Sequence, residues 1–184
     1  MSARREELLE RAYGYALEHG LASLSLRPLA EAVGSSPRVL LFLFGSKDEL
    51  VRALLERARA DELELLTPAP TGDLAAVGSR LWDWLSAPER RGLLTLWVEA
   101  YARSLVEPDG PWGGFAARTV DDWLDLLAAA QPAGRRGSAA GTAERTAVLA
   151  VLRGAMLDVL ATGDVARTTA AVRGRLQSVG KPNG

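Results

Sequence analysis

The sequence predicts an all-α protein of about nine helices. Ala, Leu, Arg and Glu dominate its 184 residues, and all four are good helix formers. Apolar residues recur at helical spacing, and no stretch shows the sustained two-residue alternation of a β-strand. The chain is 48% hydrophobic and 24% charged, which is typical of a globular protein with a core.

Two short helices are expected after a longer first helix over residues 3–18. The apolar stripe of that first helix is Leu9, Tyr13, Ala16 and Leu17, and Gly20 ends it. Ser25 is expected to cap the second helix, and Gly34 to end it. The apolar positions of the second helix follow the i, i+3, i+4, i+7 pattern: Leu26, Leu29, Ala30 and Val33.

A third helix begins after Ser35 or Ser36, with Pro37 in its first turn, and ends near Phe44 and Gly45. The segment from Ser46 to Glu49 has the pattern of a capping box. It predicts the start of a long fourth helix that reaches about Leu66.

The clearest helix-breaking segment is 67–72, which is rich in Pro, Thr and Gly. It predicts two domains, one over residues 1–66 and one over residues 73–180. Helices of the second domain are expected at 73–86, 89–105, 114–130, 143–161 and 165–178. The Gly-, Ala- and Arg-rich stretch 131–141 is expected to be a mobile loop.

Composition removes several classes of function. The chain has no cysteine and a single histidine, His19, so disulfides, thiolate metal sites and multi-histidine metal sites are excluded. No phosphate loop, dinucleotide fingerprint or Gly-x-Ser-x-Gly motif is present. We therefore expect no enzyme, no metal and no cofactor. No apolar run is long enough to cross a membrane and the N-terminus lacks a signal peptide, so a cytoplasmic protein is expected.

Charge alone does not indicate nucleic-acid binding. The formal net charge is −1, and residues 1–60 hold nine Lys/Arg against eight Asp/Glu. A DNA-binding hypothesis must therefore rest on where the cations lie.

The two short helices predict a helix-turn-helix motif. Gly34 supplies the residue that tolerates a positive φ in the turn between them. Five apolar side chains are expected to form the small core of the motif: Leu29, Ala30, Val33, Leu40 and Phe44. In such motifs the second helix enters the major groove of DNA.

The run from Ser25 to Leu50, SLRPLAEAVGSSPRVLLFLFGSKDEL, resembles the signature of the tetracycline-repressor (TetR) family. The shared features are the capped second helix, Ala-x-x-x-Gly-x-Ser in the turn, Leu and Phe at core positions of the third helix, and Ser-Lys-x-x-Leu. The resemblance covers about Leu8 to Leu55. The remainder is similar to the family only in its length and helical character.

The resemblance implies a double-stranded DNA operator and a set of contacts to it. Ser25, Ser36 and Lys47 would contact phosphates, and Arg27 would reach the DNA. The surface that reads bases would consist of Pro37, Arg38, Val39, Leu41, Phe42 and Leu43. Arg38 is the strongest candidate for direct readout, because a guanidinium forms two hydrogen bonds to guanine.

The third helix departs from the family pattern. An aromatic hydroxyl and polar or basic groups usually stand where this chain has Leu41, Phe42 and Leu43. Two interpretations remain open. Apolar groups read thymine methyls, which favours an A·T-rich target. Alternatively, the apolar patch binds a protein, or the module has lost DNA binding.

All five tryptophans lie after residue 80. Most are expected in the core, but ligand pockets are also lined by aromatic side chains, and the resemblance implies an inducer cavity. The candidates for lining it are Trp84, Trp97, Tyr101 and Trp123, with an apolar or aromatic ligand. Polar contacts would come from Glu99, Arg103 or Asp122.

The last two long helices are expected to form a homodimer interface, unless one of them packs only within its own chain. Their apolar face consists of Val148, Val151, Leu152, Ala155, Met156, Val159 and Leu160, continued by Val165, Val172, Leu176 and Val179. The hypothesis is a repressor that a small molecule releases from a palindromic operator. The alternative is a helical dimer that binds ligand or protein without DNA.

Overall fold

The computed structural model describes residues 3–21, 24–65 and 72–179. In these residues it contains ten α-helices, one short 3₁₀ helix and no strand, which confirms the all-α prediction with one helix more than expected. The chain divides into two compact units. Unit 1 comprises Met1–Leu65 and Gly92–Arg118, and unit 2 comprises Leu66–Arg91 and Thr119–Gly184.

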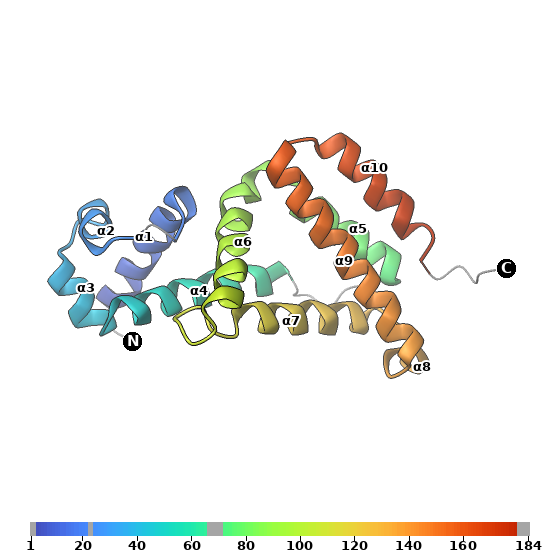
Figure 1. Cartoon of the computed structure of the whole chain (residues 1–184), viewed down its shortest axis with the longest axis horizontal. Coiled ribbons are helices and arrows are strands. Elements are labelled where there is room, and N and C mark those ends of the chain that lie inside the picture. Colours follow the sequence, from blue (N-terminus) through green and yellow to red (C-terminus); the bar gives the residue numbers. More distant parts are fainter. Residues whose placement is uncertain (1–2, 22–23, 66–71, 180–184) are drawn as a thin grey trace. The chain divides into compact units, whose positions relative to one another are not determined.

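Unit 1 begins with four helices drawn from blue to teal in Figure 1. They are α1 (Ala3–His19), α2 (Leu26–Ala32), α3 (Pro37–Phe44) and α4 (Lys47–Leu65). Two serine hydroxyls cap the third and fourth. Ser36 accepts a hydrogen bond from the Val39 amide at 3.3 Å, and Ser46 accepts one from the Glu49 amide at 3.1 Å. Capping by Ser36 and Ser46 agrees with the predicted starts of these helices.

The face of α1 that packs inward differs slightly from the predicted stripe. Leu8, Ala12, Tyr13 and Ala16 are buried, whereas Leu9 and Leu17 are only half-buried. Helix α1 packs against α4 and α2, so its buried stripe is shifted by about one residue to face both neighbours.

A polar cluster joins α1 to α4. The Tyr13 hydroxyl donates to Asp61 at 2.7 Å, and Arg57 forms ion pairs with both Asp61 and Glu10. Burial of the Tyr13 ring and the hydrogen bond to Asp61 raise the pKa of the Tyr13 hydroxyl above its ordinary value. The cluster fixes α4 along α1 and so sets the position of α3, which directly precedes α4.

Helix α6 (Arg91–Val106) belongs to unit 1 from Gly92 onward. A Cβ at Gly92 would lie 2.8 Å from the Leu17 carbonyl oxygen, so glycine permits α6 to approach α1 closely. The Leu21 amide also donates to the Glu99 carboxylate at 2.7 Å. The division into compact units therefore differs from the predicted domain boundary at 67–72, because residues Gly92–Arg118 belong to unit 1. Two domains over 1–66 and 73–180 remain a prediction, and residues 66–71 lie outside the described part.

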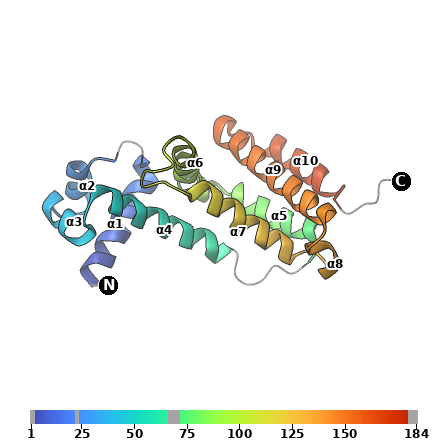
Figure 2. The same cartoon turned by 60° about the horizontal axis from the view of Figure 1, so that its bottom comes forward.

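Unit 2 contains α5 (Leu74–Leu85), the 3₁₀ helix Pro88–Arg90, α8 (Ala133–Arg136), α9 (Ala139–Thr162) and α10 (Val165–Leu176). Helix α7 (Phe115–Ala129) begins in unit 1 and continues into unit 2. Helices α9 and α10 lie side by side in both views (Figures 1 and 2) and pack against α5. A Cβ at Gly78 of α5 would lie 2.8 Å from Leu176, so this contact is also close.

The prediction of a mobile loop over 131–141 was wrong. The segment forms α8 and the start of α9, which begins at Ala139 rather than at 143. The buried Gln131 side chain connects the two ends of this segment. It donates to the Gly141 carbonyl at 2.9 Å and accepts from Arg145 at 3.1 Å. A composition rich in glycine did not reveal these hydrogen bonds, because they depend on a single glutamine.

Candidate DNA-binding site

Helices α2 and α3 form a helix-turn-helix. Gly34 has a φ of +65°, and the Ser35 amide donates to the Ala30 carbonyl at 2.8 Å, which closes the turn. The predicted core of the motif is confirmed. Its five members are each at most 5% exposed: Leu29, Ala30, Val33, Leu40 and Phe44. This core fixes the angle between the two helices and leaves the opposite face of α3 to solvent.

The solvent face of α3 is apolar apart from one arginine. Arg38, Leu41 and Phe42 are spaced i, i+3, i+4 and share one side of the helix. Phe42 is 85% exposed, and Val39 and Leu41 are each 39% exposed. Leu43 is half-buried, so only part of the predicted apolar run forms the surface. Pro37 is exposed at the first position of the helix.

Three exposed cations lie on the same motif. Arg27 is on α2, Arg38 on α3, and Lys47 is the first residue of α4. None of them forms an ion pair with another residue in the described part of the chain. Ser25 occupies the N-cap position of α2, but its side chain makes no capping hydrogen bond. Because no carboxylate among the described residues forms an ion pair with these cations, they are available to phosphates.

Two arginines of α1 form hydrogen bonds to the backbone of the helix-turn-helix, and neither contact was predicted from the sequence. The Arg5 guanidinium donates to the Leu43 carbonyl at 3.3 Å and lies 4.7 Å from the centre of the Phe44 ring. Arg11 donates to the Val33 carbonyl at 3.3 Å. The predicted stripe of α1 ran through Leu9 rather than the buried Leu8, so the face on which Arg5 lies was not recognised as the one that reaches Leu43.

The candidate ligand residues divide between the two units. Trp97 and Tyr101 lie on α6 in unit 1, with ring centroids 6.1 Å apart, and the Trp97 indole donates to Glu62 at 3.3 Å. Glu62 is only 3% exposed and was not predicted. Trp84 and Trp123 belong to unit 2. Trp123 is buried, and Trp84 lies beneath the Arg90 guanidinium at 5.1 Å.

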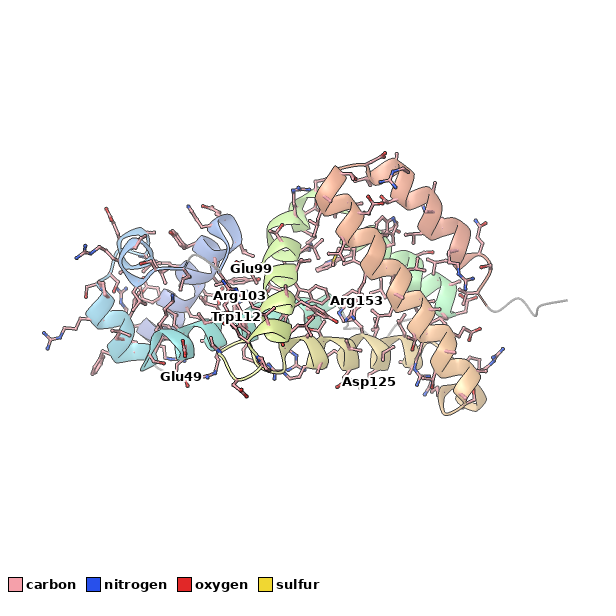
Figure 3. The ribbon with its side chains drawn as sticks, viewed as in Figure 1. Glu49, Glu99, Arg103, Trp112, Asp125 and Arg153 are labelled. Carbon is pink, nitrogen blue, oxygen red and sulfur yellow. The ribbon has the colours of Figure 1, made fainter. Side chains whose placement is uncertain are left out.

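Two of the three residues predicted to make polar contacts have partners within their own unit. Figure 3 labels Glu99 and Arg103 on α6. Glu99 accepts from the Leu21 amide, and Arg103 pairs with Glu107 one turn later. Asp122, on α7, is half-buried. Their part in ligand binding stays a prediction.

A pocket of about 240 Å³ lies in unit 2. Its lining consists of Asp73, Leu74, Ala75, Ala130, Gln131, Pro132, Arg135, Glu144 and Val179. None of the four aromatic candidates for ligand binding is among them. Within the described residues, no cluster of three His, Asp or Glu side chains is arranged to hold a metal ion.

The face predicted to join two copies is used largely inside the chain. Val148, Leu152, Met156, Val172 and Leu176 are each at most 3% exposed, because they pack among α5, α9 and α10. The solvent side of the two last helices instead carries small residues. On α9 these are Ala143, Ala150, Gly154 and Ala161, with Leu157 48% exposed, and on α10 they are Ala166, Ala170 and Gly174.

No helix in the described part of the chain is both long and apolar enough to cross a bilayer.

The fold and the site together define a class, namely helix-turn-helix proteins with a helical second part. Residues 8–54 match the family described as bacterial regulatory proteins, tetR family. Over these residues, which include the helix-turn-helix, the chain is similar to that family.

Individual relatives are similar in sequence or fold. The chain is 33% identical over 99 residues to the HTH-type transcriptional repressor AcnR of Corynebacterium diphtheriae. This match covers 54% of the chain and 49% of AcnR, so the chain spans about half the length of the curated relative it matches.

Two solved structures have the same fold. A transcriptional regulator from Rhodococcus sp. Rha1 superposes with a TM-score of 0.77 at 21% identity, over 95% of each chain. The multidrug binding protein EbrR, complexed with proflavin, superposes with a TM-score of 0.63 at 25% identity, over 94% of this chain and 99% of EbrR.

Proposed function

We propose that this chain is a transcriptional repressor that binds a palindromic operator as a homodimer and releases it when a small molecule binds. The observation that carries the proposal is the outer face of the helix-turn-helix. Arg27, Arg38 and Lys47 are exposed there without ion pairs to other described residues, beside a helix whose inner face is fixed by a buried core. AcnR, which is 33% identical to the chain over 99 residues, is described as a transcriptional repressor.

The proposed DNA contacts follow the geometry of the motif. Arg38 projects from the exposed side of α3, where a guanidinium suits the two acceptors of guanine. Ser25, Arg27, Ser36 and Lys47 contact the phosphate backbone and set the register. A chain that binds chromosomal DNA in this way works in the cytoplasm, and we propose a regulator rather than an enzyme.

The proposed ligand is aromatic or apolar and contacts α6. Trp97 and Tyr101 present neighbouring rings on this helix, which is the type of lining that holds such compounds. EbrR, with the same fold, binds proflavin, a planar aromatic compound. Trp84 and Trp123 remain candidates from unit 2.

Helix α6 also offers a path from the ligand to the DNA-binding helices. The helix that bears Trp97 and Tyr101 contacts α1 through Gly92 and holds the Leu21 amide through Glu99. A shift of α6 is therefore passed to α1, whose Arg5 and Arg11 hold the ends of α3 and α2. Ligand then weakens operator binding by the same factor by which operator weakens ligand binding.

The homodimer is proposed to form through the solvent side of α9 and α10. Small residues such as Gly154 and Gly174 permit close approach of helices, and a Cβ at either position would meet nothing within 4 Å in its own chain. Two motifs related by a two-fold axis read two inverted half-sites.

Salt dependence tests DNA binding on a duplex of any sequence, so the operator need not be identified first. Binding of the purified chain to a labelled duplex of arbitrary sequence is followed by fluorescence anisotropy between about 50 and 200 mM salt. The proposal expects a steep loss of affinity, and a smaller slope when Arg27, Arg38 and Lys47 are all replaced by alanine. Arg135→Ala, which removes an exposed arginine of α8, is the matched control. Absence of binding at the lowest salt would instead favour an interaction with protein through the apolar face of α3.

A further inference from the structure

The side of α3 that faces away from the protein core holds apolar side chains where a DNA-reading helix ordinarily presents hydrogen-bonding groups. Phe42 is 85% exposed, and Val39 and Leu41 are each 39% exposed. Only Arg38 among the residues on this side bears a hydrogen-bonding side chain. An exposed phenyl ring is unfavourable in water, so a partner is expected to cover it.

We propose that Phe42 is a specificity-determining residue that recognises the 5-methyl group of thymine in the major groove, with Val39 and Leu41 completing an apolar reading surface. The inference rests on the proposed DNA binding and names the chemistry of the half-site. The thymine methyl is the one apolar group that the base edges present in the major groove.

The charges around the apolar surface favour DNA over a protein partner. Arg38 lies one helical turn before Phe42, and Lys47 and Arg27 stand on the flanking helices without carboxylate partners in the described residues. Ser36 caps the start of α3 two residues before Arg38 and is itself exposed. Exposed cations on α3 and on its two flanking helices suit a groove bordered by phosphates.

The spacing of Arg38 and Phe42 limits where the thymine lies. Residues i and i+4 are separated by about 6 Å along a helix axis. Successive base pairs are separated by about 3.4 Å. The thymine methyl read by Phe42 therefore lies about one or two base pairs from the guanine read by Arg38.

The experiment removes single methyl groups from DNA that the protein has itself chosen. Duplexes are selected from a random library with the wild-type full chain and sequenced, and each thymine of the preferred site is replaced in turn by deoxyuridine. Uracil pairs as thymine does but lacks the methyl. The expected result is a loss of affinity of about fourfold for each contacted methyl, as for removal of one buried carbon.

Variants assign the effect to a side chain. Phe42→Ala is expected to bind the thymine and uracil duplexes equally at one position of each half-site, and to retain the wild-type circular dichroism because the ring is exposed. Lys47→Ala is expected to bind both more weakly but to keep their ratio. Leu105→Ala, a second apolar residue of unit 1 at 67% exposure, is expected to change neither affinity nor ratio.

The outcomes separate this inference from the proposed function. If no duplex is enriched at low salt, DNA binding itself is refuted. If a site is selected but wild-type protein binds its thymine and uracil forms equally, the protein binds DNA and methyl recognition is overturned. A thymine preference that survives Phe42→Ala also overturns the role of Phe42, since another side chain then reads the methyl.

Discussion

Arg38 and Lys47 carry the same charge but are placed for different tasks on DNA. Arg38 stands on the outer face of α3, whereas Lys47 begins α4 beyond the end of that helix. We expect Arg38→Ala to cost about 1–3 kcal/mol on the preferred site and to relax the sequence preference. Lys47→Ala should weaken binding equally across sequences and reduce the salt slope by about one. Competition assays with selected and scrambled duplexes measure both effects, and an unchanged preference in Arg38→Ala would contradict its assigned role.

Tyr13 supplies a prediction for alkaline pH. Burial, reinforced by the hydrogen bond to Asp61, raises the pKa of its hydroxyl in the folded state. A raised folded-state pKa stabilises the fold fully below the unfolded value near 10, and this contribution is lost as the pH rises further. Removing the hydroxyl removes this dependence.

The Tyr13→Phe variant is therefore expected to lose about 1 kcal/mol of stability at neutral pH and to show a flatter decline above about pH 10. Thermal unfolding followed by circular dichroism between pH 7 and 11 compares it with the wild type. Parallel declines of the two proteins would show that Tyr13 is not the group responsible. Tyr15, which is half-buried, provides a matched control as Tyr15→Phe.

At the scale of elements, the close packing of α6 on α1 is the contact proposed to link ligand and DNA. Gly92→Ala places a methyl 2.8 Å from the Leu17 carbonyl oxygen, and either helix must move. We expect a loss of about 1–3 kcal/mol in the free energy of unfolding, measured with urea. Gly14→Ala in α1, where a Cβ meets nothing within 4 Å, should instead stabilise by about 0.5–1 kcal/mol. Equal responses of the two variants would rule out a tight contact at Gly92.

The elements with strong local signals were predicted closely. Gly34, Ser36 and Ser46 mark the boundaries of α2, α3 and α4 in the sequence and in the structure, because each acts on backbone groups within a few residues. The predicted core of the helix-turn-helix follows from the same local pattern. Local signals therefore sufficed for the boundaries and the core of the helix-turn-helix.

Long-range contacts were not predictable in the same way. The place of α6 in unit 1 depends on Glu99 meeting the Leu21 amide, 78 positions earlier in the chain. The apolar face of α9 and α10 was interpreted as an interface because periodicity reveals which residues are buried but not what covers them. In the structure α5 covers much of it, and the small residues on the opposite side became the better candidates.

At the scale of the whole molecule, the proposed homodimer depends on the side of α9 and α10 that a single chain leaves open. Gly154→Arg adds a long charged side chain where the chain itself has nothing within 4 Å, so the fold should persist. We expect the variant to sediment as a monomer and to lose affinity for a two-half-site duplex. Gly134→Arg in α8, also at an open position, should remain dimeric. A dimeric Gly154→Arg protein would place the interface elsewhere.

The outer face of α3 is proposed to read DNA sequence in a symmetric pair. Selection of bound duplexes from a random library by the purified wild-type chain, followed by sequencing, tests it most directly. We expect enrichment of an inverted repeat whose half-sites each contain a guanine with a thymine about one or two base pairs away. Recovery of unenriched sequences at low salt would contradict it, and would leave the exposed face of α3 as a surface for protein.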